Sequence, residues 1–270
     1  MEKRNEVVII GAGKMGSAMA IQLVKRGVNV TLTAHSEEAR ARWLAHPTLS
    51  QANITIGNNA ALEAEVVVLA VKPVNLSEIY AELGGKLLPS CLVISVVAGA
   101  TVSALAKGLR HYRVVRTMPN LAAEYGEGVT VWYCRDLEKE YEAQVLEFLG
   151  QLGKEYRATD EDDLACATAL FGCGPAFLYY FLEEIEKAGK RFPKDRLHEL
   201  MVQMVRGTAV LAEQNPTAEF EHLRKAITSK GGATEEGVKV LEECGARGIM
   251  EKVIAATLNK VGHLLNGKGK

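Results

Sequence analysis

The feature that most constrains this chain is a short apolar run that leads directly into three glycines, in the stretch VVIIGAGKMG. The run 7–10 is typical of a buried strand, and residues 14–26 have the pattern of a helix. Between them, Gly11 permits a tight turn, Gly13 lets the backbone approach a pyrophosphate, and Gly16 lets the helix pack closely. Because strand, glycines and helix follow in the required order, the stretch predicts a dinucleotide-binding unit rather than an incidental turn.

The rest of the chain falls into two halves. As far as about Tyr156, helical stretches alternate with β-branched runs such as NVTLT, EVVVLAV, CLVISVVA and RVVRT, and GVTVWYC and LGKEYRA extend the sheet at one edge. Runs that are apolar on both faces are typical of a parallel sheet covered by helices. After Asp163 only helices are predicted, over residues 164–188, 194–214, 219–227, 234–243 and 248–265.

The predicted fold is therefore α/β, with two domains. Residues 1–158 form an N-terminal Rossmann-like doubly wound parallel sheet that binds the dinucleotide. Residues 159–270 form an all-α C-terminal domain for substrate binding and dimerisation.

The helical half carries more apolar surface than it can easily cover. A half of only about 110 residues rarely buries a broad stripe by itself. We therefore expect a second subunit to cover part of it, most simply in a two-fold dimer. The stripe comprises Leu197, Leu200, Met201, Met204, Val205, Val210 and Leu211.

Composition limits the partners and the compartment. The net charge of −1 removes the main argument for nucleic acid, because phosphate binding needs an excess of Lys and Arg. Five cysteines without a CxxC pair suit reduced cytosolic thiols better than disulfides or a metal site. Neither the start of the chain nor any later run is predicted to be long enough for a signal peptide or a membrane span. We therefore expect a cytoplasmic protein that acts on a small molecule, with no membrane partner.

The strand after the first helix bears on the choice of cofactor. NAD enzymes usually carry an Asp or Glu at its end, whereas this chain has TAHS at residues 33–36. This difference favours NADP(H), with NAD(H) as the alternative, and makes His35, Ser36 and Arg40 candidates to contact a 2′-phosphate. Ser36 is equally typical of a helix cap, and the two glutamates that follow it weaken the NADP inference.

A second glycine-rich loop, KAITSKGGATEEG, lies in the helical half. Gly231 and Gly232 can adopt backbone angles closed to other residues, and a helix that starts near Thr234 leaves unpaired N–H groups facing the loop. Such groups bind carboxylates or phosphates, and Ser229 and Thr234 add hydroxyls. Taken alone, the loop is explained equally well as a capped helix start.

Together the motifs resemble those of the pyrroline-5-carboxylate reductases. VVIIGAGKMGSAM, AVKP, VVRTMPN, GCGPAF and TSKGGAT occur in the order and spacing of that family, from Val7 to about Ala256. The chain departs from the family at Cys173, where serine is usual, and at Lys230, where proline is usual. Neither change removes a backbone N–H or a hydroxyl that the chemistry uses, although loop rigidity and local charge are expected to differ.

The resemblance implies reduction of 1-pyrroline-5-carboxylate to L-proline by NADPH or NADH, the last step of proline biosynthesis. It places the substrate carboxylate at Ser229 and the backbone of Gly232 and Ala233, and the hydroxyl of Thr234 near the ring nitrogen. AEQNP also resembles a family segment, which adds Glu213 to the substrate-binding residues. The resemblance further implies dimers that assemble into decamers.

The remaining site residues complete this expectation. Lys72, which stands before a proline at a strand end, joins Ser229 and Thr234 among the predicted catalytic residues. We expect catalysis mainly by orientation, because an imine nitrogen can enter already protonated. The predicted cofactor-binding residues are Gly11, Ala12, Gly13, Lys14, Met15, Gly16, His35, Ser36, Asn58, Ala70, Val71, Lys72, Pro73, Ala98 and Asn120.

Two other functions stay open from sequence. A 3-hydroxyacid dehydrogenase also begins with GxGxMG before a helical domain, but it resembles this chain less, because Lys187, the first lysine after the GCG glycines, comes late. A non-catalytic NADP-sensing oligomer would not need an anion-binding loop with two hydroxyls.

Overall fold

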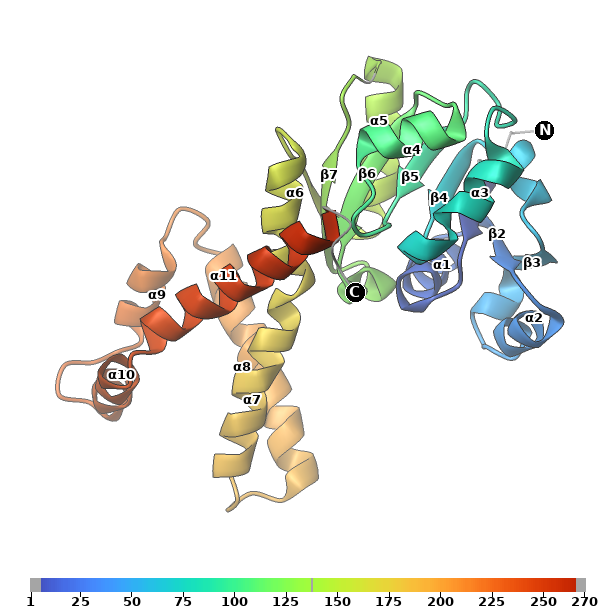
Figure 1. The fold of residues 1–270 in the computed structure, drawn as a ribbon. Coiled ribbons are helices and arrows are strands. Elements are labelled where there is room, and N and C mark those ends of the chain that lie inside the picture. The colour runs from blue at the N-terminus through green and yellow to red at the C-terminus, as the bar shows by residue number, and fades with distance from the viewer. Residues whose placement is uncertain (1–5, 137, 266–270) are drawn as a thin grey trace. The chain divides into compact units, whose positions relative to one another are not determined.

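The structure is a computed structural model that describes residues 6–136 and 138–265. The chain divides into two compact units (Figure 1). One contains the described residues up to Cys173 and those from Thr257 on, and the other contains Gly174–Ala256. The ends of the two predicted domains, residues 1–5 and 266–270, and residue 137 lie outside the described residues.

In the described part of the chain, eight strands form one sheet in the order β3-β2-β1-β4-β5-β6-β7-β8. All neighbours are parallel except β6 and β7, which are antiparallel. The predicted Rossmann-like fold is confirmed, with this one antiparallel pair. The strands are β1 (Glu6–Ile10), β2 (Asn29–Ala34), β3 (Asn53–Ile56), β4 (Val66–Leu69), β5 (Leu92–Ser95), β6 (Val114–Pro119), β7 (Gly128–Tyr133) and β8 (Gly153–Arg157).

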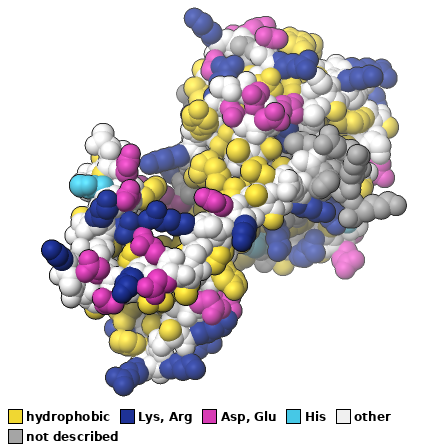
Figure 2. Space-filling view, turned by 60° about the vertical axis from the view of Figure 1, so that its left-hand side comes forward, with side chains coloured by type: hydrophobic (Ala, Val, Ile, Leu, Met, Phe, Trp, Pro, Cys, Tyr) yellow, Lys and Arg dark blue, Asp and Glu magenta, His cyan; other side chains and the backbone are white. Residues whose placement is uncertain are grey.

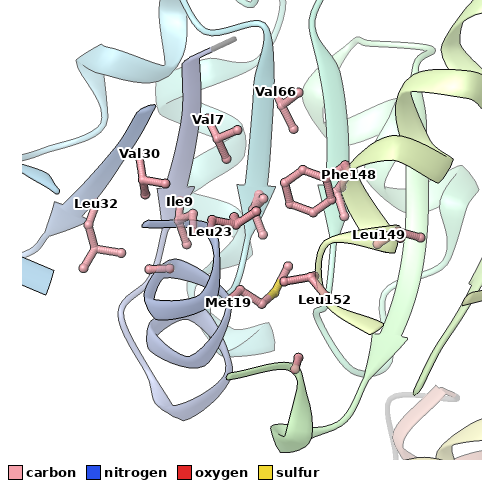
Figure 3. Packing of buried hydrophobic residues seen from close by; sticks show 14 of the residues in the cluster. Val7, Ile9, Met19, Leu23, Val30, Leu32, Val66, Phe148, Leu149 and Leu152 are labelled. Atoms are coloured by element: carbon pink, nitrogen blue, oxygen red, sulfur yellow. The ribbon is translucent and has the colours of Figure 1, made fainter. Parts of the chain in front are cut away.

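Helices cover both faces of this sheet. Met19 and Leu23 of α1 and Phe148 of α5 pack with Val7 and Ile9 of β1 on one face (Figure 3). On the other face, α3 and α4 pack over β1, β4 and β5. Burial on both faces explains why these strands are almost continuously apolar. The helices of this unit are α1 (Lys14–Lys25), α2 (Glu37–Leu44), α3 (Leu76–Leu83), α4 (Val102–Leu109), α5 (Lys139–Gly150) and α6 (Glu161–Ala167).

The first helix of the predicted helical half belongs to the sheet unit. Leu164 and Ala167 of α6 form a buried cluster with Val131 of β7. A nearly buried ion pair adds to this attachment, because Arg116 of β6 donates to Glu161 over 2.8 Å. The compact units therefore divide after Cys173, whereas the sequence patterns place a boundary after residue 158. As a division between cofactor and substrate binding, the boundary after residue 158 stays a prediction.

Burial changes the pKa of the arginine in this ion pair. The guanidinium of Arg116 is only 1% exposed, and burial lowers its pKa while the carboxylate of Glu161 opposes that change. The other carboxylate oxygen of Glu161 accepts the N–H of Val102 over 2.8 Å. One side chain thus joins α6, β6 and the start of α4.

The second unit consists of helices, as predicted, and α8 to α11 have bounds within a few residues of those expected. The single helix expected over residues 164–188 is divided by a π-helical turn, so α7 begins only at Gly174. No described residue of α7, α8, α9 or α10 is buried. Figure 2 shows hydrophobic side chains exposed among charged ones on one face of the molecule. The helices are α7 (Gly174–Ala188), α8 (Lys194–Glu213), α9 (Phe220–Ala226), α10 (Ala233–Glu243) and α11 (Ala246–Leu265), the last of which continues into the sheet unit.

One helical segment corrects the expectation about membrane spans. Residues Glu161–Ala188 are long and apolar enough to cross a membrane by length and composition alone. The sequence patterns predict no such run, and that prediction is wrong because the chain stays helical through a π-helical turn, Thr168–Gly172, into α7. A single helix of this kind is a weak indication of a membrane, because apolar helices of other proteins meet the same criteria.

Candidate functional site

The turn between β1 and α1 requires its glycines for two different reasons. Gly11 has φ = 99°, and a Cβ there would lie 2.7 Å from the carbonyl carbon of Ala70. A Cβ on Gly16 would collide with the carbonyl oxygen of Gly11. These two glycines therefore let the end of β1 approach the end of β4 and let α1 pack on the turn.

Gly13 differs from both. It is the N-cap of α1, no described side chain caps the helix there, and a Cβ on it would meet nothing within 4 Å. The first turn of α1 thus keeps unpaired N–H groups beside open space. Helix N-termini of this kind bind phosphate groups, so the turn fits the pyrophosphate of a dinucleotide.

A cavity of about 690 Å³ adjoins this turn at the carboxyl ends of β1, β2 and β4. Its volume lies in the range of small-molecule and cofactor sites. The remaining lining comes from α2, the segment after β3, and α3 with the turn before it. Of the predicted cofactor-binding residues it brings together Gly11, Ala12, Gly13, His35, Asn58, Ala70, Val71 and Lys72.

A chain of hydrogen bonds crosses one side of this cavity. The hydroxyl of Thr33, at the end of β2, donates to the side-chain oxygen of Asn58 over 2.9 Å. The amide nitrogen of Asn58 donates to the carboxylate of Glu82 on α3 over 2.5 Å. Asn58 is therefore held in a fixed orientation, as expected of a residue that positions a ligand.

The other predicted cofactor-binding residues do not line this cavity. Ala98 is exposed after β5, and Asn120 follows β6. The amide of Asn120 donates to the carbonyl of Phe171 over 3.1 Å and accepts the N–H of Ala122 over 3.2 Å, which ties β6 to the π-helical turn. Those that do not line the cavity are Lys14, Met15, Gly16, Ser36, Pro73, Ala98 and Asn120. Roles in cofactor binding stay predictions for all of the named residues, including those that line the cavity.

The residues chosen for a 2′-phosphate have other partners. The hydroxyl of Ser36 accepts the N–H of Ala39 over 3.2 Å and so caps α2. Arg40 donates to the carbonyl of Ile54 and to the carboxylate of Glu37, both over 3.3 Å. The spacing of Glu37 and Arg40, three residues apart on one helix, is a sequence signal for this pairing.

Sequence reasoning missed two neighbours on the same helix. Arg42 and Trp43 of α2 line the cavity, with the guanidinium carbon of Arg42 5.1 Å from the centre of the Trp43 ring. Arg42 follows Arg40 by two residues, about 200° around the helix, so it does not share the direction of Arg40 toward β3. Counting that phase from the cap at Ser36 is the sequence signal that identifies Arg42.

The second glycine-rich loop lies before α10, in the helical unit. Gly231 has φ = 72°, which favours glycine, and its N–H donates to the carboxylate of Glu235 over 2.6 Å. A Cβ on Gly232 would collide with the hydroxyl of Ser229. The loop therefore brings Ser229 directly onto the N-cap of α10.

One predicted donor of this loop has to be corrected. The N–H of Gly232 donates to the carbonyl of Ser229 over 3.0 Å, so the backbone closes its own turn there. No described residue accepts a hydrogen bond from the N–H groups of Ala233 and Thr234. The free donors of the loop are thus the N–H groups of the first two residues of α10, together with the hydroxyls of Ser229 and Thr234.

The remaining predicted residues are scattered. Lys72 caps a short 3₁₀ turn after β4 and lines the cofactor cavity, whereas Glu213 is exposed at the end of α8. Cys173 is half-buried after the π-helical turn, and its N–H donates to the carbonyl of Thr168 over 2.9 Å. This backbone bond does not depend on whether cysteine or serine stands at position 173.

The sheet order, the glycine turn and the cavity at the strand ends define the class as a Rossmann-type protein with the architecture of a dinucleotide-binding site. Residues 161–264 match the family model for pyrroline-5-carboxylate reductase dimerisation, and residues 6–99 match the model for NADP oxidoreductase, coenzyme F420-dependent. The pyrroline-5-carboxylate reductase of Pisum sativum is 32% identical over 257 residues, covering 92% of each chain. The chain therefore belongs to the pyrroline-5-carboxylate reductase family.

Solved structures agree with this assignment. A pyrroline-5-carboxylate reductase of Coxiella burnetii has a TM-score of 0.83 at 27% identity, over 97% of this chain and 99% of its own. A pyrroline carboxylate reductase of Plasmodium falciparum, solved with NADP bound, shares the fold with a TM-score of 0.82 at 24% identity, over 98% of this chain and 99% of its own. The predicted resemblance is confirmed, and family membership argues against the 3-hydroxyacid dehydrogenase and the non-catalytic sensor.

Family membership also explains the apolar segment 161–188. This segment opens the region that matches the dimerisation model. Its exposed apolar side chains are those expected of a subunit interface, which removes the need for a membrane to cover them.

Proposed function

We propose that the protein reduces 1-pyrroline-5-carboxylate to L-proline with NADPH, the last step of proline biosynthesis. The observation that carries this proposal is the loop before α10, in a chain of this family. There, two unpaired N–H groups, at Ala233 and Thr234, and two hydroxyls surround a helix N-terminus. Such a group of donors suits a small carboxylate, because the helix end favours negative charge.

The cavity beside the β1–α1 turn is the proposed cofactor site. Its glycines fit a pyrophosphate, since Gly13 leaves open space where a ligand can approach the backbone. Bound NADPH supplies the hydride. Lys72 lines this cavity, so we propose that it contributes to cofactor binding in addition to its predicted catalytic role.

In the substrate site, the chain's main task is orientation. Ser229 and the N–H groups of Ala233 and Thr234 hold the ring carboxylate, and the hydroxyl of Thr234 hydrogen-bonds at the ring nitrogen. We keep Glu213 as a substrate-binding residue on the basis of its family segment. No strong general acid is required, because an imine that enters protonated needs only to be held in line with the hydride donor.

Substitution of Thr234 tests this role. Thr234→Ala removes one aligned polar group, so kcat with pyrroline-5-carboxylate should fall about 100-fold, while the Kd for NADPH should stay the same. The loss of NADPH absorbance in the presence of substrate reports the rate. Thr234→Ser should restore most of the activity.

Thr228→Ala is the matched control. Its hydroxyl lies in the same segment but donates to the carbonyl of Arg224 over 2.7 Å, so it should cost little activity. Normal turnover in Thr234→Ala would remove Thr234 from the mechanism. Absence of substrate-dependent NADPH oxidation in the unaltered protein would overturn the proposed function itself.

We further propose a soluble, cytoplasmic homodimer that assembles into a decamer. The dimer is supported by the dimerisation region and by the uncovered apolar side chains of α7 and α8. Light scattering of the purified protein measures its mass. A monomer at working concentration would contradict the dimer, and a mass of two subunits would contradict the decamer.

A further inference from the structure

Arg42 stands out among the residues that line the cofactor cavity. It is exposed on α2, and its guanidinium makes no hydrogen bond or ion pair with any described residue. The guanidinium carbon of Arg42 lies over the ring of Trp43, 5.1 Å from the ring centre. A cation over an indole face is held in place while its N–H donors stay available to a ligand.

Arg42 lines the same cavity as the end of β2, the strand end at which dinucleotide enzymes distinguish their cofactors. Ala34 and His35, at the end of β2, line the same cavity. An acidic residue at that strand end would bind the ribose hydroxyls of NAD, and none stands there. A cation beside this end instead suits the 2′-phosphate of NADP.

The other candidates in this region are already occupied. Arg40 is bound to Glu37 and to the carbonyl of Ile54, and the hydroxyl of Ser36 caps α2. Neither residue lines the cavity. Two carboxylates, Glu78 and Glu82, do line it, but both are on α3, and Glu82 is held by Asn58.

Trp43 is the fixed side of this pair. It is half-buried and packs against the hydrophobic core of the sheet unit. Its ring therefore keeps one position and holds the guanidinium of Arg42 at the cavity wall.

We propose that Arg42, held against Trp43, binds the 2′-phosphate of NADPH and thereby sets the preference of this protein for NADPH over NADH. The inference rests on the proposed function for the identity of the cofactor. The planar guanidinium can donate two parallel hydrogen bonds to a phosphate, which a lysine or a hydroxyl cannot do. Arg42 is thus a specificity-determining residue that Ser36 and Arg40 do not replace.

The test is cofactor binding, measured by calorimetry on the intact protein without substrate. Four ligands are compared: NADPH, NADH, 2′,5′-ADP and 5′-AMP. Arg42→Gln, which keeps the size and removes the charge, should weaken NADPH and 2′,5′-ADP about 10- to 100-fold. Its affinity for NADH and 5′-AMP should change by less than about threefold, because neither ligand carries the phosphate.

Arg40→Gln is the matched control, two residues away on the same helix. It should change the affinity for all four ligands by less than about threefold, because Arg40 faces β3 rather than the cavity. Because Arg42 is exposed, the Arg42→Gln protein should unfold at the same temperature as the unaltered protein. Arg42→Lys should bind NADPH with intermediate affinity, since it keeps the charge and loses the paired donors.

Three results would overturn the inference. One is an equal loss of NADPH and NADH affinity in Arg42→Gln, another is no loss of either, and the third is an unaltered protein that binds NADH as tightly as NADPH. The proposed function fails by a different result, namely absence of substrate-dependent NADPH oxidation. Binding of 2′,5′-ADP does not depend on that reaction, so the two failures can be distinguished.

Discussion

The sheet unit and the helical unit of this chain solve the problem of apolar surface in opposite ways. The sheet unit buries two large clusters of side chains between its strands and its own helices. In the helical unit, no described residue of α7 to α10 is buried. Even large apolar side chains are exposed there, such as Leu211 at 56% and Tyr179 at 70%. One unit is therefore complete in a single chain, and the other is half of an interface.

This difference bears on where the two parts of the proposed reaction lie. The cofactor cavity is built on strand ends that are fixed by a buried core, so one chain is enough to form it. The proposed substrate loop lies in a unit whose helices need a partner to bury them. Oligomerisation is thus expected to matter for substrate binding more than for cofactor binding.

A charge in the uncovered apolar surface should give the largest effect. Leu211→Glu places a carboxylate on α8, and burying an unpaired charge costs at least about 3 kcal/mol. A two-fold interface carries the substitution twice, so the dimer should be weakened by about 6 kcal/mol, or about four orders of magnitude in Kd. Light scattering across a concentration series measures this change.

Leu146→Glu on α5 is the matched control in the sheet unit. Leu146 is 40% exposed, so its helix already packs against the sheet with its other face. The variant should keep the mass of the unaltered protein. If Leu211→Glu also keeps that mass, the uncovered surface of α8 is not the dimer interface.

Loss of the ion pair at α6 should have the next largest effect. Glu161→Ala leaves Arg116, which is only 1% exposed, without its partner, and an unpaired buried charge costs about 3–5 kcal/mol. Urea unfolding should show this loss. Lys187→Ala, which removes exposed ion pairs with Glu183 and Glu184 on α7, should leave the unfolding midpoint unchanged. Equal midpoints for the two variants would show that Arg116 is solvated rather than paired.

A smaller effect should separate the glycines of the cofactor turn. Gly13→Ala meets no neighbour within 4 Å, so the fold should be unchanged, whereas the Kd for NADPH should rise about tenfold because the methyl group takes the place of the pyrophosphate. Gly207→Ala on α8, which also meets nothing within 4 Å, should not change cofactor affinity. Titration of each variant with NADPH gives the comparison, and unchanged affinity in Gly13→Ala would place the pyrophosphate elsewhere.

The contrast between the sheet unit and the helical unit also explains which elements can be predicted from sequence. The sequence predicts α8 to α11 within a few residues, because the period of apolar side chains indicates a helix whether a partner chain or the same chain covers it. It does not predict the π-helical turn that divides the helix expected over residues 164–188. The strand β3 was missed, because only Ile54 of its four residues is buried and the pattern is too short to detect.

Within the sites, the type of residue is easier to predict than the direction in which its side chain or N–H group points. The sequence identifies the glycines of both loops. Gly11, Gly16 and Gly232 allow the close approach of neighbouring groups, whereas Gly13 leaves open space. The sequence favours Arg40 where we propose Arg42, and it favours the N–H of Gly232, which closes its own turn, over that of Thr234. Both predictions depend on which way a group points. Direction follows from caps and local pairs, such as Ser36 with Ala39.

The most direct test of the proposed substrate site is a crystal structure of the protein with NADP⁺ and L-proline. The carboxylate of proline should accept hydrogen bonds from the N–H groups of Ala233 and Thr234 and from the hydroxyl of Ser229, with the pyrophosphate of the cofactor in the cavity beside Gly13. Proline bound away from the α10 loop, or a cofactor phosphate in that loop, would contradict it.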